Sequence, residues 1–333
     1  MAKLHKVTLG KQIFHARSGQ NLFEAAIANG VEFPYDCRAG RCGTCLTRVR
    51  AGITLGGQTD QPGLIHACQA MVFSELALEV EHRPPVLLMR GEVVRIVEVA
   101  DDIAEVTIAS EQPLDALPGQ YCKFKFRGYP ARCFSPTLPL SAIRSDGLIR
   151  LNIKRVSGGR VTPNIGGSIN VGHKVSIEGP FGSAYLRPGL GNRLVLVGSG
   201  TGFAPIWAVA SAALRENEMR PMVLIAASRE ARAFYMGPSL SAAARYAKVS
   251  ALGCIDDLTA SQGLLRAGKP LDHLPRLTPE DIVYAAGAPS LVQAVGAAAR
   301  KVGAMFYSDP FESDVPASPS WTARAKAWLL HSA

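Results

Sequence analysis

Four cysteines constrain the N-terminal part of this chain more than any other feature. They are Cys37, Cys42, Cys45 and Cys68, so three thiols share one loop with the spacing C-x4-C-x2-C and the fourth stands apart. Gly40 and Gly43 lie between them, and glycine allows a loop to turn tightly and to direct its backbone N–H groups at an anionic centre. The first residues contain no apolar signal segment, so disulfides are not expected. The pattern predicts that the four thiols hold a metal centre.

The spacing resembles that of plant-type [2Fe–2S] ferredoxins, in which four thiolates hold two irons. A structural zinc site is the alternative, but it usually presents two close pairs of ligands, whereas Cys68 stands alone. The other cysteines, Cys122, Cys133 and Cys254, are isolated, and we expect them to be buried as small apolar side chains.

The chain around these cysteines predicts a small α+β domain. Residues 4–9 and 12–16 alternate like a hairpin, Asn21 with Glu24 begins a helix that Gly30 ends, and residues 76–80 alternate again. With the cysteines, this pattern resembles the β-grasp ferredoxin domain, which we assign to residues 1–83. Asp36 stands where that family usually has Ser before the first cysteine. Arginines on or near the loop predict docking to the chain's own flavin domain or to an acidic partner, unless they are ordinary solvated charges: Arg38, Arg41, Arg48 and Arg50.

Short alternating stretches then predict an antiparallel β-barrel over residues 88–188, after a stiff linker at residues 82–85. The expected strands are 92–99, 103–109, 121–126, 148–156 and 174–178. The tetrapeptide from Arg132 to Ser135 resembles the flavin motif R-x-[YF]-S of the ferredoxin–NADP reductase superfamily. The resemblance implies that Arg132 binds the FAD pyrophosphate, Phe134 stacks on the isoalloxazine and Ser135 lies near its N5, the last two as catalytic residues. A second segment resembles the family's phosphate turn, with Lys154, Gly159, Arg160, Val161 and Thr162 as contacts.

The third region, residues 189–312, alternates apolar strands at 194–197, 222–226, 249–252 and 282–285 with helical stretches, which predicts an α/β domain with a parallel sheet. Its first strand ends in a turn that resembles the G-x-G-x-G-x-x-P nicotinamide motif, with Gly198, Gly200, Thr201, Gly202 and Pro205 as contacts. The resemblance adds Ser228, Arg229 and Gly287 to the nucleotide site and Phe311 as a cover for the flavin. Glu230 favours NADH and Arg229 favours NADPH; we expect NADH. Ala286 replaces the family's usual cysteine.

In this order the domains resemble the reductase components of bacterial aromatic-ring dioxygenases of the naphthalene and benzoate types. The resemblance implies electron transfer from NADH through FAD and the [2Fe–2S] cluster to a Rieske ferredoxin or terminal oxygenase. A reductase for another acceptor, such as a diiron monooxygenase or a deoxysugar enzyme, and a non-catalytic [2Fe–2S] sensor are the alternatives. The net charge of +9 favours an acidic partner or phosphorylated ligand, but scattered Lys and Arg disfavour nucleic acid. We expect a cytoplasmic monomer without a membrane span. The resemblance does not cover the extension at residues 313–333.

Overall fold

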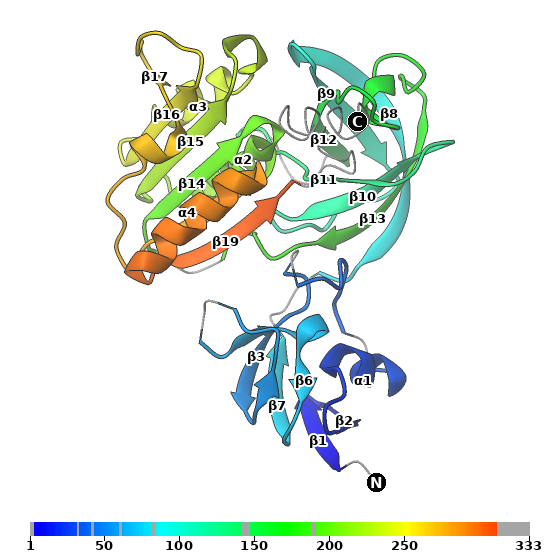
Figure 1. The fold of residues 1–333 in the computed structure, drawn as a ribbon. Helices are drawn as coiled ribbons and strands as arrows, with labels where there is room; N and C mark the ends of the chain where they lie inside the picture. The colour runs from blue at the N-terminus through cyan, green and yellow to red at the C-terminus, as the bar shows by residue number, and fades with distance from the viewer. Residues whose placement is uncertain are drawn as a thin grey trace, which may run out of the picture.

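The computed structural model describes residues 3–31, 33–40, 43–59, 62–80, 84–140, 147–187 and 191–311. Three units follow one another along the chain, and the N-terminal unit lies at one end of the molecule, beside the second (Figure 1). The expected linker residues His82 and Arg83 and the extension at 313–333 lie outside the described residues.

The N-terminal unit is a five-stranded sheet with one helix packed on it, which is the α+β class that the sequence predicts. Its strands lie in the order β2-β1-β7-β3-β5. Their bounds are β1 (Leu4–Leu9), β2 (Gln12–Arg17), β3 (Leu46–Ala51), β5 (Leu64–His66) and β7 (Leu76–Val80), with helix α1 (Leu22–Ala28), the 3-10 turn η1 (Ala67–Gln69) and the pair β4 (Thr54–Leu55) and β6 (Met71–Val72). Asn21 caps α1 because its side-chain oxygen accepts a hydrogen bond from the backbone N–H of Glu24 at 3.1 Å.

The second unit is an antiparallel barrel of six strands in the order β11-β10-β13-β8-β9-β12. The strands are β8 (Leu87–Ala100), β9 (Ile103–Ser110), β10 (Tyr121–Phe126), β11 (Arg132–Phe134), β12 (Leu148–Lys154) and β13 (Lys174–Phe181), and the 3-10 turn η2 (Thr162–Asn164) follows β12. Five of these strands are the ones predicted from alternation. The sixth, β11, has only three residues and is too short to show a period.

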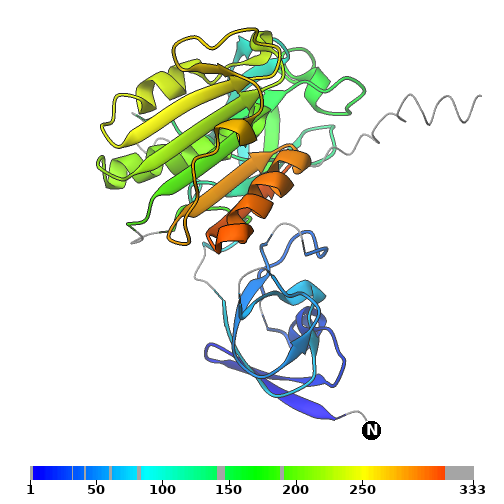
Figure 2. The ribbon, with the colours of Figure 1, turned by 60° about the vertical axis from the view of Figure 1, so that its left-hand side comes forward.

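The third unit is a parallel sheet of six strands in the order β17-β16-β15-β14-β18-β19. The elements are β14 (Leu194–Ser199), β15 (Met222–Ser228), β16 (Val249–Ile255), β17 (Leu265–Ala267), β18 (Ile282–Gly287) and β19 (Met305–Pro310), with α2 (Phe203–Glu216), α3 (Gly237–Ala243) and α4 (Pro289–Val302). Helices α2 and α3 pack on one face, against Leu194 and Leu196, and α4 packs on the other, against Val195 and Val197 (Figure 2).

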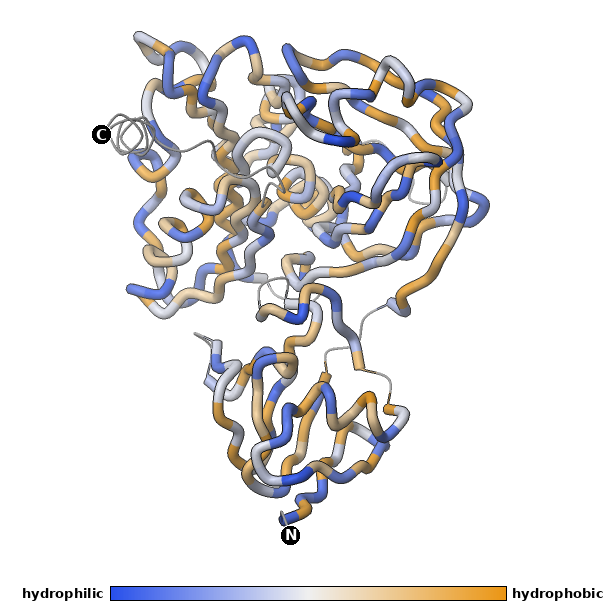
Figure 3. The backbone as a smooth tube through the Cα atoms, turned by 45° about the vertical axis from the view of Figure 1, so that its right-hand side comes forward, coloured by the Kyte–Doolittle hydropathy of each residue, from blue (hydrophilic) through white to orange (hydrophobic). Residues whose placement is uncertain are grey.

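Burial on both faces explains why the central strands of this third unit are continuous apolar runs, whereas the barrel strands alternate. In Figure 3 the central strands of the third unit are mostly hydrophobic, whereas the barrel strands change between hydrophobic and hydrophilic along their length. One expectation about the cysteines is wrong: Cys122 and Cys254 are buried, but Cys133 is exposed. In the short strand β11 the side chain of Cys133 points away from those of Arg132 and Phe134, to the outer face of the barrel.

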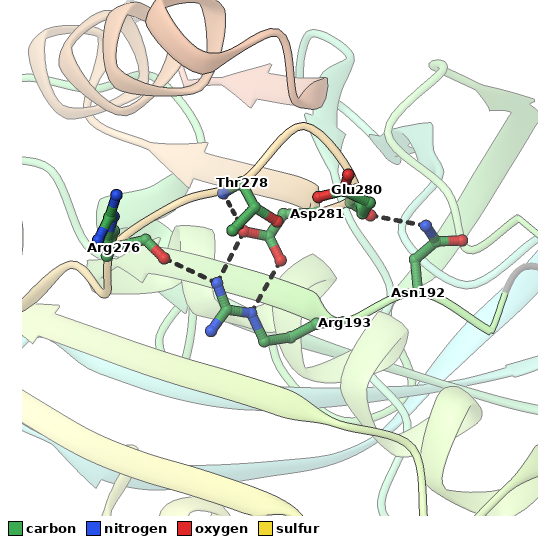
Figure 4. A network of polar contacts seen from close by, with 6 residues as sticks. All are labelled: Asn192, Arg193, Arg276, Thr278, Glu280 and Asp281. Atoms are coloured by element: carbon green, nitrogen blue, oxygen red, sulfur yellow. Dashed lines mark hydrogen bonds and ion pairs between the residues drawn. The ribbon is translucent and has the colours of Figure 1, made fainter.

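The start of the parallel sheet is fixed by one ion pair. Arg193 donates two hydrogen bonds to the carboxylate of Asp281, from Nε at 2.8 Å and from Nη2 at 2.7 Å, and the backbone N–H of Thr278 donates a third at 2.7 Å (Figure 4). Asn192 extends the network by donating to the carbonyl of Glu280 at 2.7 Å. Asp281 is 2% exposed, so these contacts hold the segments entering β14 and β18 side by side.

Candidate active site

Two of the four predicted cluster ligands lie together in the N-terminal unit. The Sγ atoms of Cys45 and Cys68 are 3.3 Å apart and both side chains are buried. Cys37 is exposed, and its sulfur accepts a hydrogen bond from the backbone N–H of Ala39 at 3.4 Å. Cys42 lies outside the described residues, among which no group of three or more His, Cys, Asp or Glu side chains is arranged to hold a metal.

Burial raises the pKa of the Cys45 thiol to about 12, and the neighbouring Cys68 and Cys37 contribute to the shift. A thiol in this position ionises only when a cation compensates its charge, as iron does. The donor chemistry of the pair therefore fits an iron–sulfur cluster, which needs soft thiolate ligands.

The loop between these cysteines depends on left-handed backbone conformations. Arg38, Gly40 and Gly43 have φ angles of 53°, 69° and 69°. A Cβ atom at Gly40 would lie 3.0 Å from Cγ of Gln69, whose Nε2 donates to the carbonyl of Arg38 at 2.7 Å. The loop is thus packed directly against η1, the turn that carries Cys68.

The flavin motif lies along β11 at the edge of the barrel sheet. Arg132 and Phe134 pair in register with Phe124 and Cys122 of β10, and the rings of Phe134 and Phe124 are 6.0 Å apart. Arg132 donates to the carbonyl of Ala131 at 2.8 Å. The predicted cationic contact, Arg132, and the predicted aromatic contact, Phe134, therefore lie on the same side of one strand. A cofactor that is bound through both a phosphate and a stacked ring requires this arrangement.

The second predicted flavin segment is a tight turn after β12. Thr162 Oγ1 accepts a hydrogen bond from the backbone N–H of Val156 at 3.0 Å, and a Cβ atom at Gly159 would lie 2.9 Å from the Val156 carbonyl oxygen. Two basic side chains of this segment, those of Lys154 and Arg160, are exposed. Val161 is 1% exposed and packs in the barrel core, so of its groups only the backbone is available for a phosphate.

The glycines of the nicotinamide motif bring two loops of the parallel sheet into contact. A Cβ atom at Gly202 would overlap the backbone of Gly287, and one at Gly198 would lie 2.7 Å from Cα of Phe203. Gly287 itself has a φ angle of 111°. The backbone N–H of Ala288 donates to Ser199 Oγ at 2.9 Å and joins the same two loops.

Gly200 has a different role in that turn. Its φ angle is 53°, and no described atom outside its immediate neighbours lies within 4 Å of the position where a Cβ would stand. Gly200, Thr201 and Gly202 form the 3-10 turn η3, which leads into the fourteen-residue helix α2, and Pro205 lies in the first turn of that helix. Open space at a glycine beside a helix N-terminus fits a nucleotide pyrophosphate, because the backbone N–H groups and the helix dipole both favour an anion.

Sequence reasoning missed Asp309. The hydroxyl of Ser135 donates to Asp309 Oδ2 at 3.0 Å, so this contact joins the flavin motif of the barrel to β19 of the nicotinamide domain. Burial raises the pKa of Asp309 to about 7, although the hydrogen bond from Ser135 opposes that rise. Asp309 also pairs in register with Ala286, where the family usually has cysteine. The sequence placed Asp309 in the segment that ends at Phe311, but β19 was not predicted, and only its pairing with β18 brings the carboxyl to the flavin motif.

The remaining predicted residues lie at the carboxyl ends of two strands of the parallel sheet, β19 and β15. Phe311 follows β19, and its backbone N–H donates to the carbonyl of Gly287 at 2.8 Å. Ser228 ends β15, and its hydroxyl donates to the carbonyl of Glu230 at 2.8 Å. Arg229 is exposed.

Arg232, also after β15, was not among the nucleotide contacts predicted from the sequence. It forms an ion pair with Glu230, and the hydrogen bond from its guanidinium lowers the pKa of that carboxyl. The pair holds a negative and a positive charge side by side at the end of β15. The carboxylate of Glu230 favours NADH, whereas the guanidinium of Arg232 favours the 2′-phosphate of NADPH.

A thiolate loop, a barrel edge with a flavin motif and a glycine turn on a parallel sheet together define an iron–sulfur flavoprotein reductase. Family models match each unit: the 2Fe-2S iron-sulfur cluster binding domain at residues 7–73, the oxidoreductase FAD-binding domain at 91–185 and the oxidoreductase NAD-binding domain at 196–296. The chain belongs to the family of ferredoxin–NAD(P)+ reductase components of oxygenase systems. It is an oxidoreductase that binds a [2Fe–2S] cluster, FAD and NAD(P)H.

Three relatives illustrate the similarity. The reductase component of the naphthalene 1,2-dioxygenase/salicylate 5-hydroxylase systems of Ralstonia sp. is 30% identical over 305 residues, covering 87% of this chain and 92% of its own. The naphthalene 1,2-dioxygenase reductase component of Pseudomonas putida is 29% identical, covering 88% of this chain and 94% of its own. The solved structure of a ferredoxin reductase in carbazole 1,9a-dioxygenase is 26% identical and matches with a TM-score of 0.64, covering 94% of this chain and 99% of its own. No helix within the described ranges is long and apolar enough to span a membrane.

Proposed function

We propose that this chain takes electrons from NADH and delivers them singly to a Rieske ferredoxin or a terminal ring-hydroxylating oxygenase. When bound, FAD accepts two electrons as a hydride and the [2Fe–2S] cluster carries one electron at a time. The protein's role is to hold the donor next to the flavin and the flavin next to the cluster, so that electrons pass from one to the next. We further propose that it works in the cytoplasm as a monomer.

The observation that carries this proposal is the hydrogen bond from Ser135 to Asp309. Ser135 directly follows β11, the strand with the flavin motif, and Asp309 lies on β19. Strand β19 pairs with β18, and β18 ends in Gly287. Gly287 in turn packs against Gly202 of the nucleotide turn. The two predicted cofactor sites are therefore adjacent, which is the arrangement that hydride transfer needs.

The site residues have the following proposed roles. Arg132, Lys154, Gly159, Arg160, Val161 and Thr162 hold the FAD phosphates, and Phe134, Ser135 and Phe311 hold the isoalloxazine. Gly198, Gly200, Thr201, Gly202 and Pro205 hold the nicotinamide nucleotide, with Ser228, Arg229 and Gly287 completing its site. Cys37, Cys42, Cys45 and Cys68 ligate the cluster.

NADH is the proposed donor because of the ion pair between Glu230 and Arg232. A carboxylate at the end of β15 is suited to accept hydrogen bonds from the ribose hydroxyls of NADH. The same carboxylate occupies Arg232, which would otherwise attract the 2′-phosphate of NADPH.

The experiment is an anaerobic titration of the purified protein, followed by its visible spectrum, with NADH and NADPH added separately. Bleaching of both the flavin and the cluster bands by NADH at concentrations where NADPH has no effect supports the proposed route and donor. Flavin bands that bleach while the cluster bands persist contradict the route. The acceptor is tested by adding an oxidised Rieske ferredoxin, whose reduction must accelerate NADH oxidation.

A further inference from the structure

The residue before the first predicted cluster ligand contacts the flavin barrel. Asp36 precedes Cys37, and its carboxylate forms an ion pair with Lys123 of β10 through Oδ1. Its other oxygen, Oδ2, accepts a hydrogen bond from the hydroxyl of Tyr121, on the same strand. The side chain of Asp36 is only 10% exposed, so the barrel covers this carboxylate.

The other end of the cysteine loop contacts the barrel as well. The backbone N–H of Gly182, just after β13, donates to Thr44 Oγ1 at 3.0 Å. A Cβ atom at Gly43 would overlap the hydroxyl of Ser183, so the Ser183 side chain packs against the backbone of the loop at a position that only glycine leaves open. Thr44 and Ser183 are 2% and 6% exposed. The loop is therefore held at both ends, by Asp36 and by Thr44.

The barrel residues that contact Asp36 lie on the strand next to the one that carries the flavin motif. Lys123 pairs in register with Cys133, the residue between Arg132 and Phe134. The Lys123 ammonium lies 4.5 Å from the ring centre of Phe181, which ends β13 and packs against Tyr121 with ring centres 5.8 Å apart. The strand that contacts the cysteine loop, β10, is therefore paired directly with β11, which carries the predicted flavin contacts Arg132 and Phe134.

We propose that Asp36, with Lys123 and Tyr121, is a positioning residue that docks the cluster loop on the flavin barrel for electron transfer within the chain. Rotation of the N-terminal unit away from the barrel would lengthen the path between flavin and cluster, and the Asp36 contact opposes that rotation with a charge pair that is largely shielded from water. This role rests on the proposed electron route, and it gives Asp36 a function that is distinct from metal ligation.

The test measures two successive steps in the same sample. Stopped-flow spectra of the NADH-reduced protein follow flavin bleaching and then cluster bleaching in Lys123→Met, Asp36→Asn and the double variant. We expect flavin bleaching to keep its rate and cluster bleaching to slow about tenfold or more, since the rate falls with the docked fraction. Small-angle X-ray scattering of the same variants should give a larger radius of gyration. Lys125→Met, two residues further along β10 and exposed, is the matched control and should behave like the parent protein.

Lys123→Met lies in the barrel, so its result stands even where Asp36→Asn fails to assemble a cluster. The double variant should be no slower than the slower single variant, because both changes remove one interaction. Cluster bleaching at the parent rate with an unchanged radius of gyration in Lys123→Met overturns the proposal. Fully additive losses in the double variant overturn it too. A parent protein whose cluster NADH does not reduce would refute the proposed function instead, and the scattering result would still report on docking.

Discussion

Asp309 is a residue whose protonation state should matter for the hydride step. Its pKa of about 7 means that it is neutral below this pH and a carboxylate above it. A carboxylate beside the flavin motif disfavours negative charge arriving on the ring, so flavin reduction by NADH should slow as the pH rises through about 7. Stopped-flow rates from pH 6 to 8.5 measure the midpoint.

Two variants separate this residue from other titrating groups. Asp309→Asn should keep the fast, low-pH rate throughout the range because it cannot ionise. Ser135→Ala should move the midpoint upward, since the hydrogen bond from Ser135 lowers the pKa of Asp309. An unchanged midpoint in Asp309→Asn would assign the titration to another group.

At the scale of elements, the turn between β14 and α2 depends on contact between two glycines. In Gly202→Ala the added Cβ would overlap the Gly287 backbone, which has no flexible atoms to move aside. Forcing such a contact typically costs about 1–3 kcal/mol, and here it also separates the two loops of the nucleotide site. We expect a rise in the KM for NADH of about tenfold or more with full FAD content. Gly237→Ala, a glycine of the same domain with open space around it, is the control.

The ion pair at the start of the sheet gives a prediction for stability. Burial alone would raise the pKa of Asp281, but hydrogen bonds from Arg193 and Thr278 outweigh it and lower that pKa below its ordinary value of 3.8. A lowered pKa stabilises the fold above about pH 4, and this contribution is lost as the pH falls through the folded value. Arg193→Met leaves a buried carboxylate without its partner and should cost roughly 3 kcal/mol at pH 7. Urea unfolding at pH 7 and pH 3 checks this, and a loss that is the same at both values would contradict it.

Most elements were predictable from the sequence because their periods are long enough to read. The five long barrel strands and the parallel strands β14, β15, β16 and β18 alternate or run apolar over four or more residues. In the N-terminal unit, β3 to β6 were missed. In the other two units β11, β17 and β19 were missed, the first two because they have three residues each and the third because its mixed sequence from Met305 to Pro310 has no clear period. The same gap hid Asp309, whose contact with Ser135 spans 174 positions and exists only once both strands are placed.

At the scale of the whole molecule, the units have separate cores but share polar contacts. Among the residues that the structure describes, those of the apolar core of the N-terminal unit all lie between Val7 and Val80. Its contacts with the barrel include the carboxylate of Asp36 and the hydroxyl of Thr44. Polar contacts across separate cores suit an electron carrier, because they fix an orientation without making the folding of one unit depend on another.

The separate cores predict that the cluster can be removed without loss of the flavin. Cys68→Ser removes a sulfur that lies 3.3 Å from that of Cys45, and we expect it to abolish the cluster bands. FAD content and the rate of flavin bleaching by NADH should stay within about twofold of the parent values, since no described residue of the barrel or nicotinamide cores belongs to the core around Cys68. Reduction of a Rieske ferredoxin should disappear. Cys254→Ala, at a buried cysteine of the parallel sheet, should keep both sets of bands. Loss of FAD in Cys68→Ser would instead mean that the flavin barrel needs the assembled cluster domain in order to fold.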